Sequence, residues 1–281
     1  MRTGLLAGLA VGAVLLGACG GPTTAPTTSR PPSSTSTSTT TTTGPPRSST
    51  TTTTSTLPPT TTTPSSLVVP AGLAGKEWNV IPTTAKVVAL TFDAGANADG
   101  VAKILATLAT ERVRATFFLT GNFVSAYPSA ARAIASAGMR LGDHSITHPY
   151  FTELTDAEIR HEVLGARSQI LSVTGSDPWP WFRFPYFDRN EHTIAVVNSV
   201  GFVPIGWTVD TLGWEGTSGG ITVSTVVSRV LANLQPGEIV VMHCGSNPTD
   251  HSTLDADALP TVIHDVRARG YSFVTLDALL P

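Results

Sequence analysis

Residues 87–119 read VVALTFDAGANADGVAKILATLATERVRATFFL, and this stretch decides the fold. Its two ends, residues 87–92 and 115–119, are apolar runs rich in β-branched and aromatic side chains, as buried strands are. Between them, Gly100 to Thr110 repeats apolar side chains at helical spacing. A strand, a helix and a second strand of these lengths form a unit in which the two strands run parallel. The stretch therefore predicts an α/β fold.

The same alternation continues to the end of the chain. Apolar runs predict further strands at residues 139–141, 181–184, 202–207, 239–242 and 271–276. Helical patterns lie between them at residues 128–137, 156–173, 191–199, 223–234 and 257–269, and Thr155 with Glu158 can form a capping box. Seven strands of this kind form either an open doubly wound sheet or a closed barrel. In the barrel, the active site is expected at the carboxyl ends of the strands.

The N-terminus predicts export. Arg2 precedes an apolar stretch at residues 5–17 that is too short to span a bilayer, so residues 1–18 are interpreted as a signal peptide. The sequence Leu-Gly-Ala-Cys at residues 16–19 looks like a bacterial lipoprotein box, with lipidation at Cys19. A plain secretory signal with an incidental cysteine is the alternative. The lipid would hold the protein on the outer face of the cell membrane, facing the wall.

Residues 19–66 are almost entirely Thr, Ser and Pro after the cysteine, with no acidic residue. Such a segment cannot offset its ordering entropy, so we expect a disordered stalk, either O-glycosylated or unmodified. Residues 67–281 are long enough for one domain with a sizeable core. That domain carries all 20 acidic residues and 14 of the 17 Lys and Arg residues, which gives no support for a nucleic-acid partner. We expect a monomer that contacts the membrane only through the lipid.

Polar residues follow several of the predicted strands. Asp93 follows the first, Arg183 ends the fourth and His243 follows the sixth. Their positions at the same edge of a parallel sheet favour one site. A solvated turn for Asp93 and a buried core role for His243 are the ordinary alternatives.

Two histidines four residues apart, His144 and His148, follow the third predicted strand. Two imidazoles at this spacing can face one point in space and suit Zn²⁺, with Co²⁺ or Mn²⁺ as alternatives. The pattern is weak by itself, since it also occurs by chance.

In chain order the motifs are TFD at 91–93, HSITH at 144–148, RFPY at 183–186, DTLGW at 210–214 and His243. Together they resemble the polysaccharide deacetylases, the NodB homology domain of carbohydrate esterase family 4. The resemblance implies a distorted (β/α)7 barrel that removes N- or O-acetyl groups from sugar polymers. It also implies a divalent metal held by one Asp and two His.

The resemblance assigns roles to matching residues. Asp93 would be the general base, Arg183 would position it, and His243 would protonate the leaving group. The backbone N–H of Tyr186 would bind the oxyanion, and Tyr186 and Trp214 would offer apolar faces to a sugar.

Three positions depart from the family pattern, and each lacks an acidic group. Ala94 replaces the metal-binding Asp, so the third ligand is open. The candidates are Asn97, Asp99, Asp143 and a water or acetate, and a site that binds metal weakly or not at all is the alternative. Gly213 replaces an Asp that orients the final His, a role for which Asp210 is the candidate. Cys244 replaces an Asp after that His.

The predicted function is a hydrolase that removes acetyl groups from peptidoglycan, or from chitin oligosaccharide or xylan, by metal-assisted attack of water. A catalytically impaired carbohydrate-binding lipoprotein on the same fold is the main alternative, and Ala94 supports it. A structural surface protein in which the stalk is the functional part is a second alternative.

Overall fold

The computed structural model describes residues 67–281. The predicted signal peptide, the lipidation site at Cys19 and the stalk lie outside the described residues. Within residues 67–281, no helix is both long and apolar enough to cross a membrane.

One parallel sheet forms the centre of the described chain. Its strands are β1 (Val87–Ala94), β2 (Thr116–Leu119), β3 (Arg140–Asp143), β4 (Trp181–Phe182), β5 (Val203–Pro204), β6 (Val209–Asp210), β7 (Glu238–His243) and β8 (Ser272–Val274). They pair in the order β5-β4-β3-β2-β1-β7-β6, and β8 pairs with the first half of β1. Only residues 205–208 connect β5 at one edge to β6 at the other, so the two edges lie within about 18 Å of each other. The sheet therefore curls into a distorted barrel, and the predicted fold class is confirmed.

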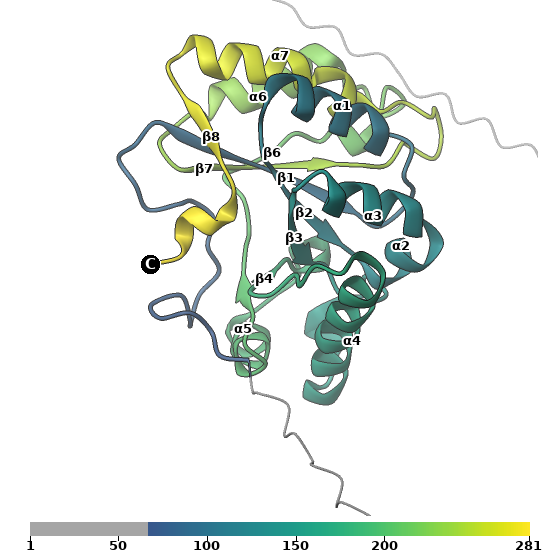
Figure 1. The fold of residues 1–281 in the computed structure, drawn as a ribbon, viewed down its shortest axis with the longest axis vertical. Coiled ribbons are helices and arrows are strands. Elements are labelled where there is room, and N and C mark those ends of the chain that lie inside the picture. The colour runs from purple at the N-terminus through teal and green to yellow at the C-terminus, as the bar shows by residue number, and fades with distance from the viewer. Residues whose placement is uncertain (1–66) are drawn as a thin grey trace, which may run out of the picture. The chain divides into compact units, whose positions relative to one another are not determined.

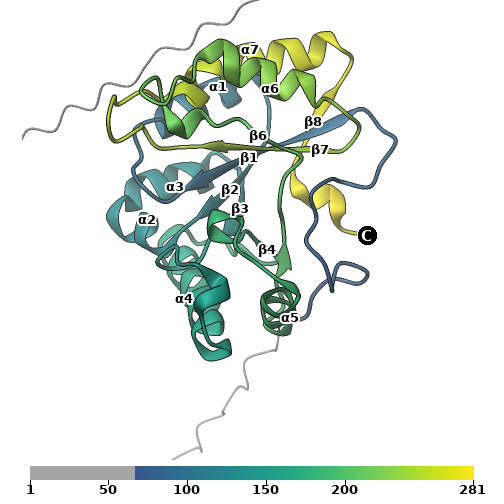
Figure 2. The ribbon, with the colours of Figure 1, turned by 180° about the vertical axis from the view of Figure 1, so that it is seen from behind.

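The helices surround this sheet. They are α1 (Val101–Glu111), α2 (Gly121–Ala126), α3 (Pro128–Ser136), α4 (Asp156–Thr174), α5 (Glu191–Ser199), α6 (Val223–Ala232) and α7 (Leu254–Ala268). In Figures 1 and 2, α1, α6 and α7 lie together beside β1 and β7, while α2, α3 and α4 lie beside β2 and β3. The capping box predicted at Thr155 and Glu158 is present at the start of α4.

The largest local differences from the sequence-based expectation concern three elements, and the strands expected at residues 181–184, 202–207 and 271–276 are shorter, at 181–182, 203–204 and 272–274. The short helix α2 and the two-residue strand β6 were not expected, because neither is long enough to show a hydrophobic period. The last helix begins at Leu254 rather than at residue 257. The expected start kept Pro260 in the first helical turn, where proline is tolerated, whereas the observed helix carries it in its interior.

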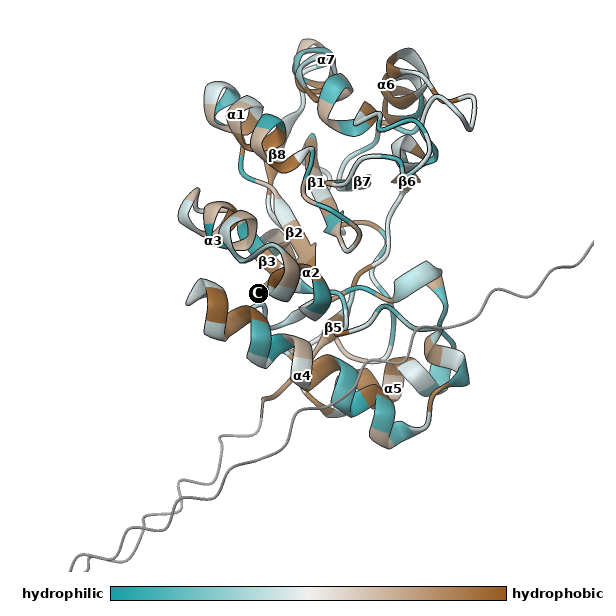
Figure 3. Ribbon diagram, turned by 90° about the vertical axis from the view of Figure 1, so that its right-hand side faces the viewer, coloured by the Kyte–Doolittle hydropathy of each residue, from teal (hydrophilic) through white to brown (hydrophobic). Residues whose placement is uncertain are grey.

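The alternation of side chains along β1 divides the core into two layers. Leu90, Phe92 and Ala94 belong to the cluster packed under α1 and α7, whereas Ala89 packs with Trp181 in the barrel interior. Helices such as α4 and α5 carry hydrophobic and hydrophilic residues side by side (Figure 3), as expected for elements that cover a core with one face. By this alternation Asp93 faces the interior at the carboxyl end of β1.

Candidate active site

Asp93 and Arg183 form a buried ion pair at the centre of the site. Arg183 Nη1 donates to Asp93 Oδ1 at 2.7 Å, and the Arg183 side chain has no exposed surface beyond 1%. Two further donations, to the carbonyls of Ile205 and Gly206 at 3.2 Å each, hold the guanidinium in place. Burial alone raises the pKa of Asp93, but opposing contributions, the largest of them the charge of Arg183, hold that pKa below its usual value. Asp93 is therefore a carboxylate at neutral pH, as a general base must be.

His144 faces the other oxygen of this carboxylate. Its Nδ1 lies 2.9 Å from the carbonyl of Arg183, and since a carbonyl only accepts, Nδ1 carries the proton. The unprotonated Nε2 then lies 3.6 Å from Asp93 Oδ2. The ring of His148 meets that of His144 edge-on, with centroids 4.7 Å apart. Burial lowers the pKa of both histidines, that of His148 to about 3, so both are neutral and able to bind a metal.

The third metal ligand has no counterpart in the site. Ala94 is fully buried in the cluster under the helices. Asn97 accepts a hydrogen bond from the backbone N–H of Ser246, and Asp99 accepts one from the hydroxyl of the same residue. The buried Asp143 accepts a hydrogen bond from the backbone N–H of Ser145. None of these three candidates lines the cavity that contains the histidines. Among residues 67–281 no three His, Cys, Asp or Glu side chains are grouped as metal ligands are, so the residues fit two positions of the family's metal site and not the third.

His243 stands beside Asp93 at the end of the neighbouring strand. The register of β1 against β7 pairs the two residues directly. Cys244, one residue later, is fully buried, and burial raises the pKa of its thiol well above the usual value, so it belongs to the core as a neutral thiol. The predicted orienting residue, Asp210, reaches the cavity, but its carboxylate accepts the backbone N–H of Leu212 at 2.8 Å. The carboxylate that lies against His243 is Asp255, which the sequence did not single out.

Aromatic side chains form the two walls. Tyr186 has a left-handed backbone with φ of 56°, and its ring stacks on Tyr150 at 4.3 Å and meets His148 edge-on at 4.5 Å. Trp214 lies on the far wall, 6.3 Å from His243 between ring centroids. Both Tyr186 and Trp214 are exposed, so each can offer a flat apolar face to a ligand.

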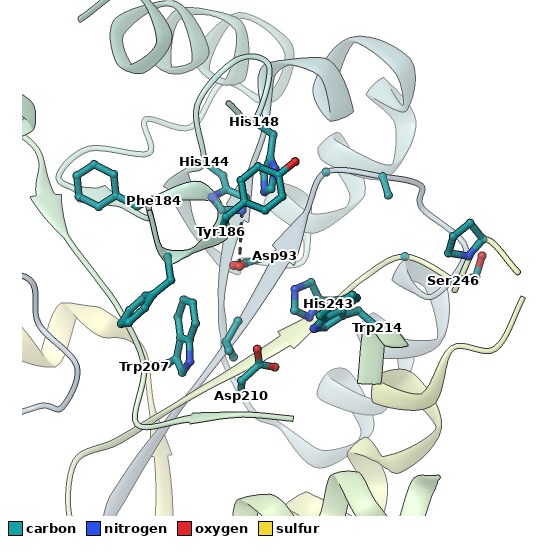
Figure 4. Close-up of a pocket in the computed structure, with 16 residues that line it drawn as sticks. Asp93, His144, His148, Phe184, Tyr186, Trp207, Asp210, Trp214, His243 and Ser246 are labelled. Carbon is teal, nitrogen blue, oxygen red and sulfur yellow. Dashed lines mark ion pairs between the residues drawn. The ribbon is translucent and has the colours of Figure 1, made fainter. Parts of the chain in front are cut away.

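One cavity of about 640 Å³ joins these groups. Figure 4 shows His144, His148 and Tyr186 on one side of Asp93, and His243, Trp214 and Asp210 on the other. Arg183 lies behind Asp93 and does not line the cavity. A cavity of this volume can hold at most a few sugar rings of a ligand. The arrangement brings a buried carboxylate, Asp93, and an imidazole, His243, to the lining of one open space.

The comparisons with known proteins agree with this architecture. The family model described as polysaccharide deacetylase matches residues 81–205. A peptidoglycan-N-acetylglucosamine deacetylase of Bacillus cereus is 32% identical over 192 residues, covering 68% of this chain and 67% of that protein. The peptidoglycan-N-acetylglucosamine deacetylase PgdA of Listeria monocytogenes is 33% identical over 196 residues; the match covers 70% of this chain but spans only 39% of that protein.

Solved structures give the same result. WT BA3943 of Bacillus anthracis, described as a CE4 family pseudoenzyme, superposes with a TM-score of 0.67 at 27% identity, covering 74% of this chain and 70% of that one. The Bc1960 peptidoglycan N-acetylglucosamine deacetylase superposes with a TM-score of 0.66 at 29% identity, covering 73% and 92%. Deacetylases of this family generally depend on a divalent metal. With the barrel, the ordered motifs and these relatives in agreement, the chain belongs to the polysaccharide deacetylase family.

Proposed function

We propose that this protein hydrolyses acetyl groups from a cell-wall polysaccharide, with peptidoglycan as the favoured substrate and N-acetyl groups as the favoured target. The observation that carries the proposal is the pair of neighbouring groups that line the cavity, Asp93 held ionised by Arg183 and His243 at the end of the adjacent strand. The relatives named as peptidoglycan deacetylases support the choice of polymer. Chitin oligosaccharide and xylan remain the alternative substrates to test.

The steps follow from the chain's own residues. Asp93 removes a proton from water, and the water oxygen attacks the acetyl carbonyl, which gives a tetrahedral intermediate. We assign the backbone N–H of Tyr186, in its left-handed turn, to the oxyanion. His243 as imidazolium donates its proton to the leaving amine nitrogen while the C–N bond breaks. The products are acetate and a free amine on the sugar.

The metal is a separate proposal. His144 and His148 are buried, neutral and adjacent, so they suit Zn²⁺, or Co²⁺ or Mn²⁺, as two of its ligands. Because Ala94 supplies no third ligand, none of the steps above is assigned to a metal.

The test is acetate release from acetylated peptidoglycan, chitin oligosaccharide and xylan. The protein is stripped with chelator and assayed before and after addition of Zn²⁺, Co²⁺ or Mn²⁺. Asp93→Asn, which keeps the size of the side chain, is the matched control. Acetate release by the wild-type protein that is lost in Asp93→Asn supports the proposal. No release from any of the polymers with any metal refutes it.

A second candidate is a glycan-binding protein without catalysis. It is favoured by Ala94 and by the likeness to the BA3943 pseudoenzyme. This candidate predicts that wild-type protein and Asp93→Asn bind glycan equally while neither releases acetate.

The proposed location is the outer face of the membrane, through lipid on Cys19, with residues 19–66 as the spacer to the wall. Membrane fractionation tests it: Cys19→Ala should release the protein from the membrane fraction, and an unchanged distribution would contradict the anchor.

A further inference from the structure

A buried carboxylate that the proposed mechanism does not use lies directly behind His243. Asp255, in the first turn of α7, is 2% exposed. Its Oδ1 accepts the hydroxyl of Thr211 at 2.7 Å, and its Oδ2 accepts the backbone N–H of His243 at 2.8 Å. The same Oδ2 lies 3.8 Å from Nδ1 of the His243 ring. This Nδ1 is buried and has no hydrogen-bond partner among residues 67–281, and Asp255 is the one acidic side chain of those residues within 4.0 Å of it.

The space that Asp255 occupies is available because residue 213 is glycine. A Cβ at Gly213 would lie 2.3 to 2.6 Å from the three carboxyl atoms of Asp255, closer than real Cβ atoms approach other atoms. The backbone of Gly213 is not left-handed, so glycine is required there by space and not by conformation. A side chain at 213 would therefore require the carboxylate of Asp255 to leave its present position. In this chain the acidic group next to His243 comes from the helix.

We propose that Asp255 is the positioning residue of His243, holding its ring with Nδ1 protonated and Nε2 directed to the cavity. The proposal rests on the proposed function, in which His243 is the proton donor. Two hydrogen bonds fix the Asp255 carboxylate, so the imidazole meets a preorganised negative charge. Such a charge accepts a hydrogen bond from Nδ1–H and so selects the tautomer that remains after the Nε2 proton has gone to the leaving group. Asp210 does not do this, because its carboxylate does not come within 4.0 Å of a His243 ring nitrogen, whereas that of Asp255 does.

The first experiment separates positioning from folding and from substrate binding. Asp255→Ala and Asp255→Asn are compared with Asp257→Asn, a change on the same helix whose carboxylate pairs with Lys103 at the surface. Both Asp255 variants should lower kcat for acetate release by about 100-fold with KM unchanged, within the range that general acid catalysis contributes. Asp257→Asn should keep the kcat of the wild type. Equal kcat in Asp255→Asn and wild type would overturn the proposal.

The second experiment does not need turnover. Nitrogen-15 NMR of the His243 ring above neutral pH reports which nitrogen carries the proton. Wild-type protein should show protonated Nδ1, and Asp255→Ala should lose that preference. If wild-type protein releases no acetate but this change in tautomer occurs, the proposed function fails and the positioning role stands. An unchanged tautomer would refute the positioning role, whatever the activity.

The third experiment moves the carboxylate. Gly213→Asp alone should clash with Asp255 and lower the melting temperature. Combined with Asp255→Ala, the same change places an acid in the vacated space and should recover at least 10-fold of the lost kcat, as a positioning charge restored beside the same ring would. A double variant that melts like the wild type yet is no more active than Asp255→Ala would count against the proposal.

Discussion

The buried pair of Asp93 and Arg183 allows a quantitative prediction. Arg183→Met keeps a long side chain but removes the guanidinium, which lies 2.7 Å from the carboxylate of Asp93. At an effective dielectric constant of about 20, two unit charges at this distance attract each other by about 6 kcal/mol. The variant also leaves the carbonyls of Ile205 and Gly206 without these donors, at about 1 kcal/mol each. Apolar packing of methionine and protonation of Asp93 recover part of this, so we expect a net loss of about 3–5 kcal/mol at pH 7.

The loss of stability in Arg183→Met should depend on pH, and the shift in the pKa of Asp93 decides in which direction. In the wild type the pKa of Asp93 is lowered, so the ionised pair stabilises the fold above the unfolded value near 3.8, and this contribution is lost as pH falls through the folded pKa. Without Arg183, burial dominates and raises the pKa of Asp93. The difference in stability between variant and wild type should therefore shrink between pH 7 and pH 4. Acetate release should fall at neutral pH as well, because a protonated Asp93 cannot act as base.

Urea unfolding followed by tryptophan fluorescence at both pH values measures this difference. Arg160→Met is the matched control, because Arg160 pairs with Asp156 at 3.4 Å on an exposed face of α4. An exposed pair of this kind contributes less than about 1 kcal/mol. A loss below about 1 kcal/mol for Arg183→Met at pH 7, or an equal loss at pH 7 and pH 4, would refute the reasoning.

Three further results are expected. Burial raises the pKa of Asp255 to about 6, so its ionisation opposes folding above the unfolded value of 3.8. The free energy of unfolding of Asp255→Asn should therefore exceed that of the wild type by up to about 3 kcal/mol at pH 7.5 and equal it near pH 4. A less stable Asp255→Asn at pH 7.5 would contradict this. Ala94→Asp buries a carboxyl group at a fully buried position and should lower stability by at least about 1–3 kcal/mol, measured by thermal melting in the presence of chelator. If the new carboxylate completes a metal site with His144 and His148, Zn²⁺ at 100 times its Kd should raise the free energy of unfolding of this variant by about 2.7 kcal/mol. An identical melting temperature with and without Zn²⁺ would argue against His144 and His148 as two of the metal ligands. Tyr150→Ala removes the ring that stacks on Tyr186 and should raise the KM for a glycan about 5-fold while kcat stays constant, as measured by steady-state acetate release. A change in kcat instead would mean that Tyr150 acts in the chemical step and not in substrate binding.

The sequence predicted most of the residues of the site but not which of them are in contact with one another. Asp93, His144, Arg183 and His243 were all expected at strand ends, and the structure brings them to one cavity or directly behind it. The pairing of Asp93 with Arg183 was expected only from the family resemblance, since the two residues are 90 positions apart and no local pattern links them. Asp255 was missed because the predicted helix began two residues after it, and because an acidic residue in a first helical turn has an ordinary explanation in the helix dipole.

By itself the sequence determined the α/β class, the positions of most strands and helices, and the residues able to carry the chemistry. These depend on hydrophobic period, capping and turn residues, which act over a few neighbouring positions. Only the tertiary structure decided that Asp93 stands beside His243, because the register of β1 against β7 is a long-range pairing. It also decided that Asp255 fills the space beside Gly213, since two side chains compete for one volume only after α7 has packed on the sheet.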